Sequence, residues 1–199
     1  MKSDIILAGV GGQGILTIAT IIGHAAVERG LYLKQAEVHG MSQRGGDVQS
    51  HLRISDKVIH SDLIPEGKAD LIISIEPMEA LRYTSFLAPD GWLIANRKPF
   101  VNIPNYPDHE QVWATIEAMP RSVLIDADKL AREVATARSM NIVILGAASG
   151  HVGMSTEELE HSITAIFQRK GDAVVQQNIA ALRAGRAYAD AKDLAAHGV

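Results

Sequence analysis

Two glycine-rich segments near the start of the chain carry the residue types that could bind a ligand. The first, Gly9-Val10-Gly11-Gly12-Gln13-Gly14, fits the pattern G-x-G-x-x-G and lies between an apolar segment and a helical one. This context is typical of a loop that binds a dinucleotide. Its glycines permit positive φ and a close approach, while the following helix offers free N–H groups to an anion. We therefore predict an anion-binding loop, although a tight turn without a ligand fits the same pattern.

The second segment is His39-Gly40-Met41-Ser42-Gln43-Arg44-Gly45-Gly46, which places an arginine directly before two glycines. A guanidinium beside backbone N–H groups is a typical site for a phosphate or a carboxylate. A surface loop with a solvated arginine is the alternative interpretation. Both segments follow predicted strands, as do Glu76 and Asn96.

Open α/β sheets bind ligands in a crevice at the carboxyl ends of their strands, so we expect these residues to share one crevice. The predicted cofactor-binding residues are Gly9, Gly11, Gly12, Gln13, Gly14, Arg44, Gly45 and Gly46. The residues predicted to face a substrate or another subunit in this crevice are His39, Met41, Ser42, Gln43, Glu76 and Asn96. No residue is assigned a catalytic role from the sequence.

Composition excludes several kinds of chemistry. The 199 residues include no cysteine, so disulfides, thiolate nucleophiles, thiolate zinc sites and an iron–sulfur cluster held by this chain are excluded. The eight histidines show no H-x-x-x-H spacing, and we predict no metal site. A net charge of -4 gives no indication of nucleic-acid binding. No apolar run reaches the ~18 residues of a membrane helix, so a cytoplasmic protein is expected.

Apolar segments of strand length alternate with helical segments over the first two thirds of the chain. Strands are predicted at Asp4–Val10, Leu31–Val38, Val48–Ile54, Ala69–Ile75, Gly91–Ala95 and Ser122–Asp126, with Val58–His60 pairing back as a hairpin. Helices are predicted at Ile15–Arg29, Pro77–Phe86, Glu110–Ala118, Ala127–Arg138, Asn141–Ala148, Ser155–Arg169 and Asp172–Lys192. This order predicts a single α/β domain over residues 1–199, with a Rossmann-like first βαβ unit and a helical part at about 139–192. The sheet is expected to be mostly parallel but mixed, because the hairpin adds an antiparallel element.

Three longer segments carry a resemblance to a known family. They are GVGGQGILTIATIIGHAAVERG, EVHGMSQRGGDVQSHLRI and LIPEGKADLIISIEPMEALRY. They resemble the gamma-type component of 2-oxoacid:ferredoxin oxidoreductases, and most of all the beta subunits of indolepyruvate:ferredoxin oxidoreductases. The resemblance continues through NIVILGAASG and AVVQQNIAALRAGRAYA to near the end of the chain. Its most specific part is the run E-V-H-G-M-S-Q-R-G-G.

The resemblance implies a three-layer α/β/α subunit of an enzyme that oxidatively decarboxylates indolepyruvate or another arylpyruvate to an acyl-CoA. Thiamine diphosphate, magnesium and 4Fe-4S clusters would belong to a large partner subunit, and electrons would pass to ferredoxin. Coenzyme A is the cosubstrate that this resemblance suggests for the glycine loop and Arg44. The sequence agrees, because it has neither cysteines nor a G-D-G motif for thiamine diphosphate. The chain is therefore not expected to be active alone.

Two other functions remain open from the sequence. Glu37 follows Gly14 by 23 residues, where an acid of a dinucleotide-binding fold binds a ribose hydroxyl. The chain could therefore be a stand-alone nicotinamide-dependent oxidoreductase. It could also be a non-catalytic scaffold for a larger subunit, with an apolar patch that a homodimer covers when the chain is isolated.

Overall fold

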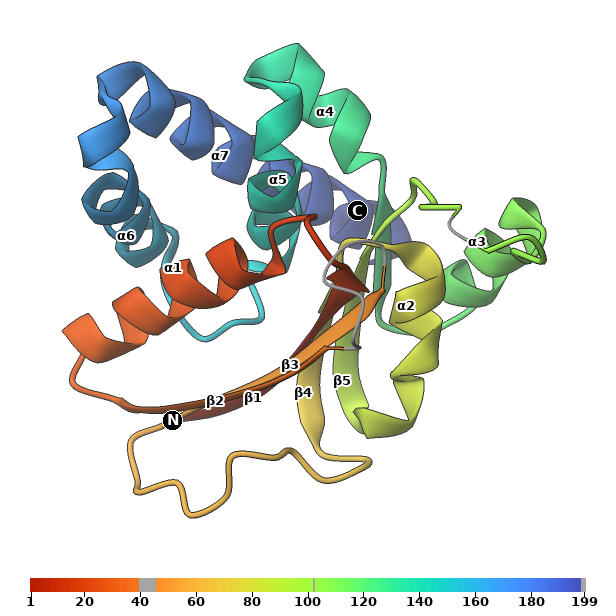
Figure 1. Ribbon diagram of the computed structural model, residues 1–199, viewed down its shortest axis with the longest axis horizontal. Coiled ribbons are helices and arrows are strands. Elements are labelled where there is room, and N and C mark those ends of the chain that lie inside the picture. Colours follow the sequence, from red (N-terminus) through yellow and green to blue (C-terminus); the bar gives the residue numbers. More distant parts are fainter. Residues whose placement is uncertain (40–45, 102, 198–199) are drawn as a thin grey trace.

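The computed structural model describes residues 1–39, 46–101 and 103–197 (Figure 1). Its sheet contains the strands β1 (Lys2–Val10), β2 (Tyr32–His39), β3 (Asp47–Ser55), β4 (Ala69–Ser74), β5 (Leu87–Asn96) and β6 (Ser122–Ile125). Their order across the sheet is β2-β3-β1-β4-β5-β6, and β3 runs antiparallel to both of its neighbours. The pairs β1–β4, β4–β5 and β5–β6 are parallel. The prediction of a mostly parallel, mixed sheet is confirmed.

Helices cover both faces of this sheet (Figure 1). One face carries α1 (Ile15–Glu28), α4 (Ala127–Val134), α5 (Met140–Ala148), α6 (Thr156–Phe167) and α7 (Asp172–His197). The other face carries α2 (Pro77–Arg82) and α3 (His109–Glu117). Short 3-10 turns follow α2 at Thr84–Phe86, precede α5 at Ala137–Ser139 and follow α6 at Gln168–Lys170. The three-layer α/β/α arrangement and the helical C-terminal part are confirmed.

The central strand β1 shows why two helical layers are needed. Ile5 and Leu7 are fully buried in the core beneath α1 and α5, whereas Ile6 and Ala8 are fully buried in the core beneath α2. Successive side chains of a strand point to opposite faces, so a continuous apolar run has to be covered on both sides. The predicted capping box also forms, because Ser155 Oγ accepts from Glu158 N at 3.1 Å and Glu158 Oε2 accepts from Ser155 N at 2.7 Å.

The antiparallel element differs from the expected one. The predicted return strand at Val58–His60 is wrong, because those residues are not in a strand. Instead β3 pairs with β2 and is inserted between β2 and β1. Antiparallel neighbours can be joined by a short connection, whereas parallel neighbours need a crossover, and only residues 40–46 separate these two strands. Glu37 is consequently exposed on the edge strand, two strands away from the glycine loop on β1.

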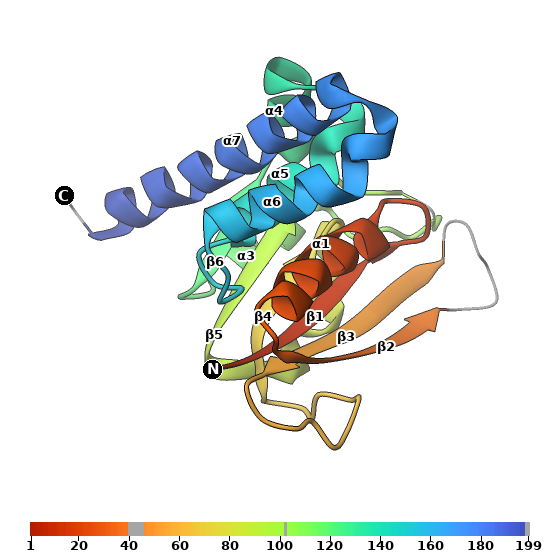
Figure 2. The same ribbon diagram turned by 90° about the vertical axis from the view of Figure 1, so that its left-hand side faces the viewer.

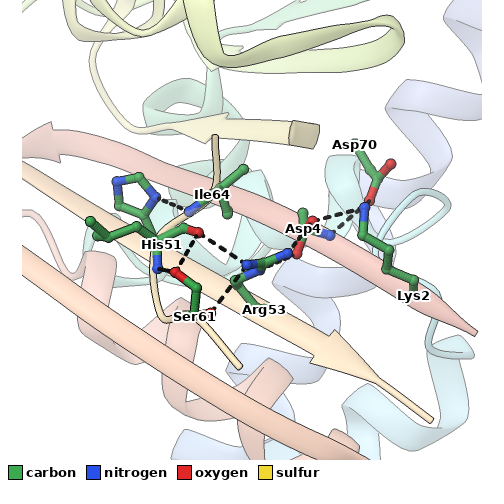
Figure 3. A network of polar contacts seen from close by, with 8 residues as sticks. Lys2, Asp4, His51, Arg53, Ser61, Ile64 and Asp70 are labelled. Carbon is green, nitrogen blue, oxygen red and sulfur yellow. Dashed lines mark hydrogen bonds and ion pairs between the residues drawn. The ribbon is translucent and has the colours of Figure 1, made fainter. Parts of the chain in front are cut away.

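Side chains rather than strand pairing hold the segment 56–68 against the sheet (Figure 3). Arg53 of β3 forms two hydrogen bonds to the buried carboxylate of Asp4, from Nε at 2.8 Å and from Nη2 at 3.1 Å. Its Nη1 donates to the carbonyl oxygens of Ser61 and Leu63. His51 is 4% exposed, and its Nδ1 accepts the Ile64 N–H at 3.0 Å. Because Nδ1 accepts this bond, the neutral ring carries its proton on Nε2, which lies 3.0 Å from the side-chain amide of Gln49.

This arrangement predicts a loss of stability at mildly acidic pH. Burial and, to a lesser degree, the Arg53 guanidinium lower the pKa of His51 below its usual value of 6.5. The contribution of His51 to stability is therefore present above about pH 6.5 and is lost as the pH falls toward the lower folded-state pKa. Protonation of Nδ1 also removes the acceptor for Ile64 N–H. Denaturant unfolding at pH 8 and pH 5 should show a smaller loss of free energy for His51→Gln than for the unaltered chain. Because burial also lowers the pKa of His151, both proteins should lose some free energy of unfolding at pH 5. Equal losses in the two proteins would show that His51 is not the cause of the additional loss.

Candidate functional site

The glycine loop between β1 and α1 is held by hydrogen bonds between its own residues. Gly12 and Gly14 have φ of 96° and 89°, in the left-handed region that favours glycine. Gln13 Oε1 accepts the Val10 N–H at 2.8 Å, and Gln13 N donates to Val10 O at 3.2 Å. The side chain of Gln13 therefore shapes the loop by binding its backbone. Gly9 is buried, and a Cβ there would lie 2.9 Å from Ile15 Cδ1. A larger residue at this position would require the Ile15 side chain to shift.

The structure brings the end of the second glycine-rich segment to the first. Gly11 N donates to Gly46 O at 2.9 Å, and the strand pairing places Val10 opposite Asp47. His39 is the last residue of β2. The remaining residues of this segment that the sequence singled out lie outside the described residues: Met41, Ser42, Gln43, Arg44 and Gly45.

Glu76 lies at the expected edge of the sheet, but both of its carboxylate oxygens accept hydrogen bonds from the protein itself. The side chain is 1% exposed and caps α2, where Oε2 accepts the Glu79 N–H at 2.9 Å. Oε1 accepts the Phe100 N–H at 3.1 Å and the hydroxyl of Tyr106. Burial and this bond to Glu76 raise the pKa of Tyr106 above its usual value. Glu76 therefore anchors the segment after β5 to α2.

Asn96 plays a similar part at the end of β5. It is 1% exposed, and its Nδ2 donates to Asp128 Oδ2 at 2.9 Å and to Ile75 O at 3.3 Å. Its Oδ1 accepts the Ala127 N–H at 3.2 Å. Asn96 thus connects β5 to the end of β4 and to the start of α4. Both residues lie at the carboxyl edge of the sheet, and each of their side-chain polar atoms already has a hydrogen-bond partner.

A cavity of about 810 Å³ adjoins the glycine loop on its α1 side. Ligand sites in proteins commonly have volumes of roughly 300–1,000 Å³. Its walls come from the loop, the start of α5, and the turn between α6 and α7, and Figure 2 shows this turn at the same end of the molecule as the loop. The main lining residues are Gly12, Gln13, Gly14, Thr17, Arg138, Ser139, Asn141, Phe167, Lys170, Gln177 and Asn178. Asn141 Nδ2 donates to Gly14 O at 3.1 Å and so joins the loop to α5.

Comparison with known proteins gives the family. Residues 4–188 match the family model described as pyruvate ferredoxin/flavodoxin oxidoreductase. The chain belongs to this family. It is 36% identical to indolepyruvate oxidoreductase subunit IorB of Archaeoglobus fulgidus, over 93% of this chain and 94% of that protein. It is 38% identical to the Pyrococcus horikoshii protein of the same name, over 80% of this chain and 84% of the other. The resemblance to gamma-type subunits is therefore confirmed.

A solved structure has the same fold. The 2-oxoglutarate:ferredoxin oxidoreductase of Magnetococcus marinus, solved with 2-oxoglutarate, coenzyme A and succinyl-CoA bound, matches with a TM-score of 0.75 at 23% identity. The match covers 96% of this chain and 31% of the other, so this chain spans about a third of that longer chain. The α/β/α unit of the present protein thus also occurs within a larger oxidoreductase chain.

The described part of this oxidoreductase-family chain contains no group of three or more histidine, aspartate or glutamate side chains that could hold a metal ion. None of its helices in the described ranges is long and apolar enough to cross a membrane. The cavity walls at 136–141 and 167–178 could not be predicted from the sequence. No local motif marks those residues, and only packing brings them to a loop more than 120 positions earlier.

Proposed function

We propose that this chain is the small subunit of a 2-oxoacid:ferredoxin oxidoreductase that acts on indolepyruvate or another arylpyruvate. The observation that carries the proposal is the match, over most of the chain, to indolepyruvate oxidoreductase subunits at 36% and 38% identity. The reaction would be the oxidative decarboxylation of the oxoacid to an acyl-CoA. Ferredoxin would receive the electrons through the assembled enzyme.

The cofactors of this reaction fit a partner better than this chain. A 4Fe-4S cluster is held by cysteine thiolates, and this chain has none. The magnesium that accompanies thiamine diphosphate needs oxygen ligands, and no suitable cluster exists among the described residues. We therefore assign thiamine diphosphate, magnesium and the clusters to a large partner subunit. This chain would contribute the glycine loop, where the phosphates of coenzyme A are the candidate ligand.

The stand-alone nicotinamide-dependent oxidoreductase is the weaker proposal. A ribose-binding acid has to lie beside the glycine loop, on the strand next to β1. Glu37 instead lies on β2, and β3 separates β2 from β1. Adjacent strands are about 4.8 Å apart, so two spacings separate Glu37 from the strand that carries the loop.

The test is an anaerobic affinity purification of the tagged full chain from its native host. The expected result is a large partner that carries iron and thiamine diphosphate, with ferredoxin reduction that depends on indolepyruvate and coenzyme A. The isolated chain is expected to show no turnover. Capture of the chain alone, without iron or thiamine diphosphate, would overturn the proposal.

Replacing Arg44 distinguishes a role of this chain in the reaction from a purely structural role in the assembled enzyme. In the assembled enzyme, Arg44→Ala is expected to lower turnover roughly 30- to 1,000-fold if Arg44 binds a charge that develops in the reaction, as loss of one oxyanion-hole donor does. Size-exclusion chromatography should show unchanged assembly. A scaffold role predicts either lost assembly or no effect on turnover.

A further inference from the structure

Helix α5 is apolar except for one side chain near its start. Its sequence is Met-Asn-Ile-Val-Ile-Leu-Gly-Ala-Ala, and residues 141–148 are all buried. Asn141 is the polar exception, with 8% of its surface exposed. Burying an amide costs free energy unless the amide is hydrogen-bonded. The position of Asn141 in this helix therefore has to be explained by the group that it binds.

That group is the backbone of the glycine loop. Asn141 Nδ2 donates to Gly14 O at 3.1 Å, across 127 positions of sequence. Gly14 is the N-cap of α1 and has a φ of 89°, so this carbonyl lies at the point where the loop becomes a helix. A Cβ at Gly14 would lie 2.6 Å from Asn141 Nδ2, so the amide fills the space beside the glycine. The loop and α5 are thus in direct contact.

The loop has few other links to the rest of the molecule. Among the described residues, two hydrogen bonds join residues 11–14 to segments distant in the sequence, and the second runs from Gly11 N to Gly46 O at 2.9 Å. Gly46 belongs to the connection between β2 and β3, whereas Asn141 belongs to a buried helix that packs against α1 and α7. The cavity of about 810 Å³ adjoins the loop, so close packing does not hold the loop on that side. Asn141 therefore connects the loop to a firmly packed part of the protein.

We infer that Asn141 is a positioning residue, which holds the glycine loop ready for its ligand through the bond to Gly14 O. The inference rests on the proposed function, because it assumes that the loop takes part in the reaction. A loop that is fixed before binding does not have to be ordered when the ligand arrives. Without the bond, only a fraction of the molecules would carry a receptive loop, and the apparent affinity would fall by that fraction. The fully bound enzyme would react as before, so KM changes and kcat does not.

The first experiment measures the kinetics of the assembled enzyme with Asn141→Leu, which keeps the size of the side chain and removes its donor. The KM for coenzyme A is expected to rise roughly five- to tenfold, as the loss of one hydrogen bond predicts, while kcat and the KM for indolepyruvate stay within about twofold. Asn141→Ala is the second variant, for the case that leucine does not fit beside Gly14.

Ser149→Ala is the matched control. Ser149 is 2% exposed and lies at the opposite end of α5 from Asn141, where its Oγ donates to Gly146 O at 2.7 Å within the same helix. This variant also loses a buried hydrogen bond, but the bond to Gly14 remains. Its KM for coenzyme A should therefore stay within about twofold of the unaltered enzyme.

The second experiment separates positioning of the loop from a direct contact between Asn141 and the ligand. Hydrogen–deuterium exchange of the ligand-free full chain, followed by mass spectrometry, reports how often residues 9–17 open. Gln13 N donates to Val10 O and Gly11 N to Gly46 O, and these amides exchange when the loop opens. Asn141→Leu should speed their exchange roughly five- to tenfold relative to Ser149→Ala, which loses stability without losing the bond to Gly14.

A raised KM for coenzyme A together with faster exchange of the loop would support the inference. An unchanged KM in both Asn141 variants would overturn it. Loop exchange no faster than in Ser149→Ala would overturn it as well, because Asn141 would then be a ligand contact or a general support of the fold.

Failure of the proposed function would look different. If the unaltered chain captures no iron-bearing partner, the proposed function fails, whereas the exchange measurement needs neither a partner nor a ligand. If the assembled enzyme turns over but the Asn141 variants match Ser149→Ala in KM and in exchange, only this inference fails.

Discussion

Replacing Gly185 by alanine is expected to lower the free energy of unfolding by at least ~3 kcal/mol, at the upper end of what overpacking costs. Gly185 lies in α7 where that helix crosses α5. A Cβ at this position would overlap the carbonyl oxygen of Val143 and lie 2.9 Å from Ala147 N. These are backbone atoms that cannot rotate away, so the two helices would have to separate.

The direction of the change in stability distinguishes a tightly packed glycine from one with free space around it. In a helix interior with free space, a glycine-to-alanine change stabilises by roughly 0.5–1 kcal/mol. Gly23→Ala in α1 is the control, since its nearest neighbour is the flexible Leu33 side chain, at 3.1 Å. Thermal unfolding should show a midpoint lowered by roughly 6–12 °C for Gly185→Ala and a change of less than about 3 °C for Gly23→Ala. An unchanged or raised midpoint for Gly185→Ala would show that α5 and α7 do not pack at this distance.

The second large effect is expected for Asp4→Asn. Asp4 is 1% exposed and accepts two hydrogen bonds from Arg53, whose side chain is 17% exposed (Figure 3). Removing one partner of a buried ion pair costs roughly 3–5 kcal/mol, because the other charge stays buried without compensation. Lys2 contributes less, since its side chain is 54% exposed and can return to water. Urea unfolding should therefore show a lower transition midpoint for Asp4→Asn with little change in slope.

A surface pair gives the matched control. Asp190 accepts from Arg186 four residues earlier on α7, and both side chains are substantially exposed. Asp190→Asn should cost less than about 0.5 kcal/mol, as exposed pairs of this spacing do. The double variant Asp4→Leu/Arg53→Met removes both buried charges and is expected to recover part of the loss. If the double variant is as unstable as Asp4→Asn, the unpaired charge is not the cause.

The order and type of the elements could be read from the sequence because they depend on local patterns. The apolar run that became β1, the Ser155 capping box and the glycine loop before α1 all form where they were predicted. The predicted helix and strand boundaries were less accurate where a helix ends in a tighter 3-10 turn. The helix predicted at Pro77–Phe86 ends at Arg82 and continues as a 3-10 turn, and β5 begins at Leu87 instead of Gly91.

Predicting the site from the sequence was less complete. Glu76 and Asn96 were correctly placed at the carboxyl edge of the sheet, because parallel strands end together there. Their roles could not be read from the sequence, since Glu76 accepts hydrogen bonds from Phe100 and Tyr106 and Asn96 donates one to Asp128, all distant in the chain. A carboxylate in a sequence looks the same whether it is free or bonded to three donors.

The amino-acid sequence alone was enough to establish the family, the alternation of strands and helices, and the exclusion of a cluster held by this chain. Those properties reside in residue types and in spacings of a few positions. The position of β3 between β2 and β1 depends on the three-dimensional fold, and so does the cavity that Arg138 and Lys170 line together with the glycine loop. Strand pairing and cavity walls arise from contacts between segments far apart in the chain, and such contacts depend on how the whole core packs.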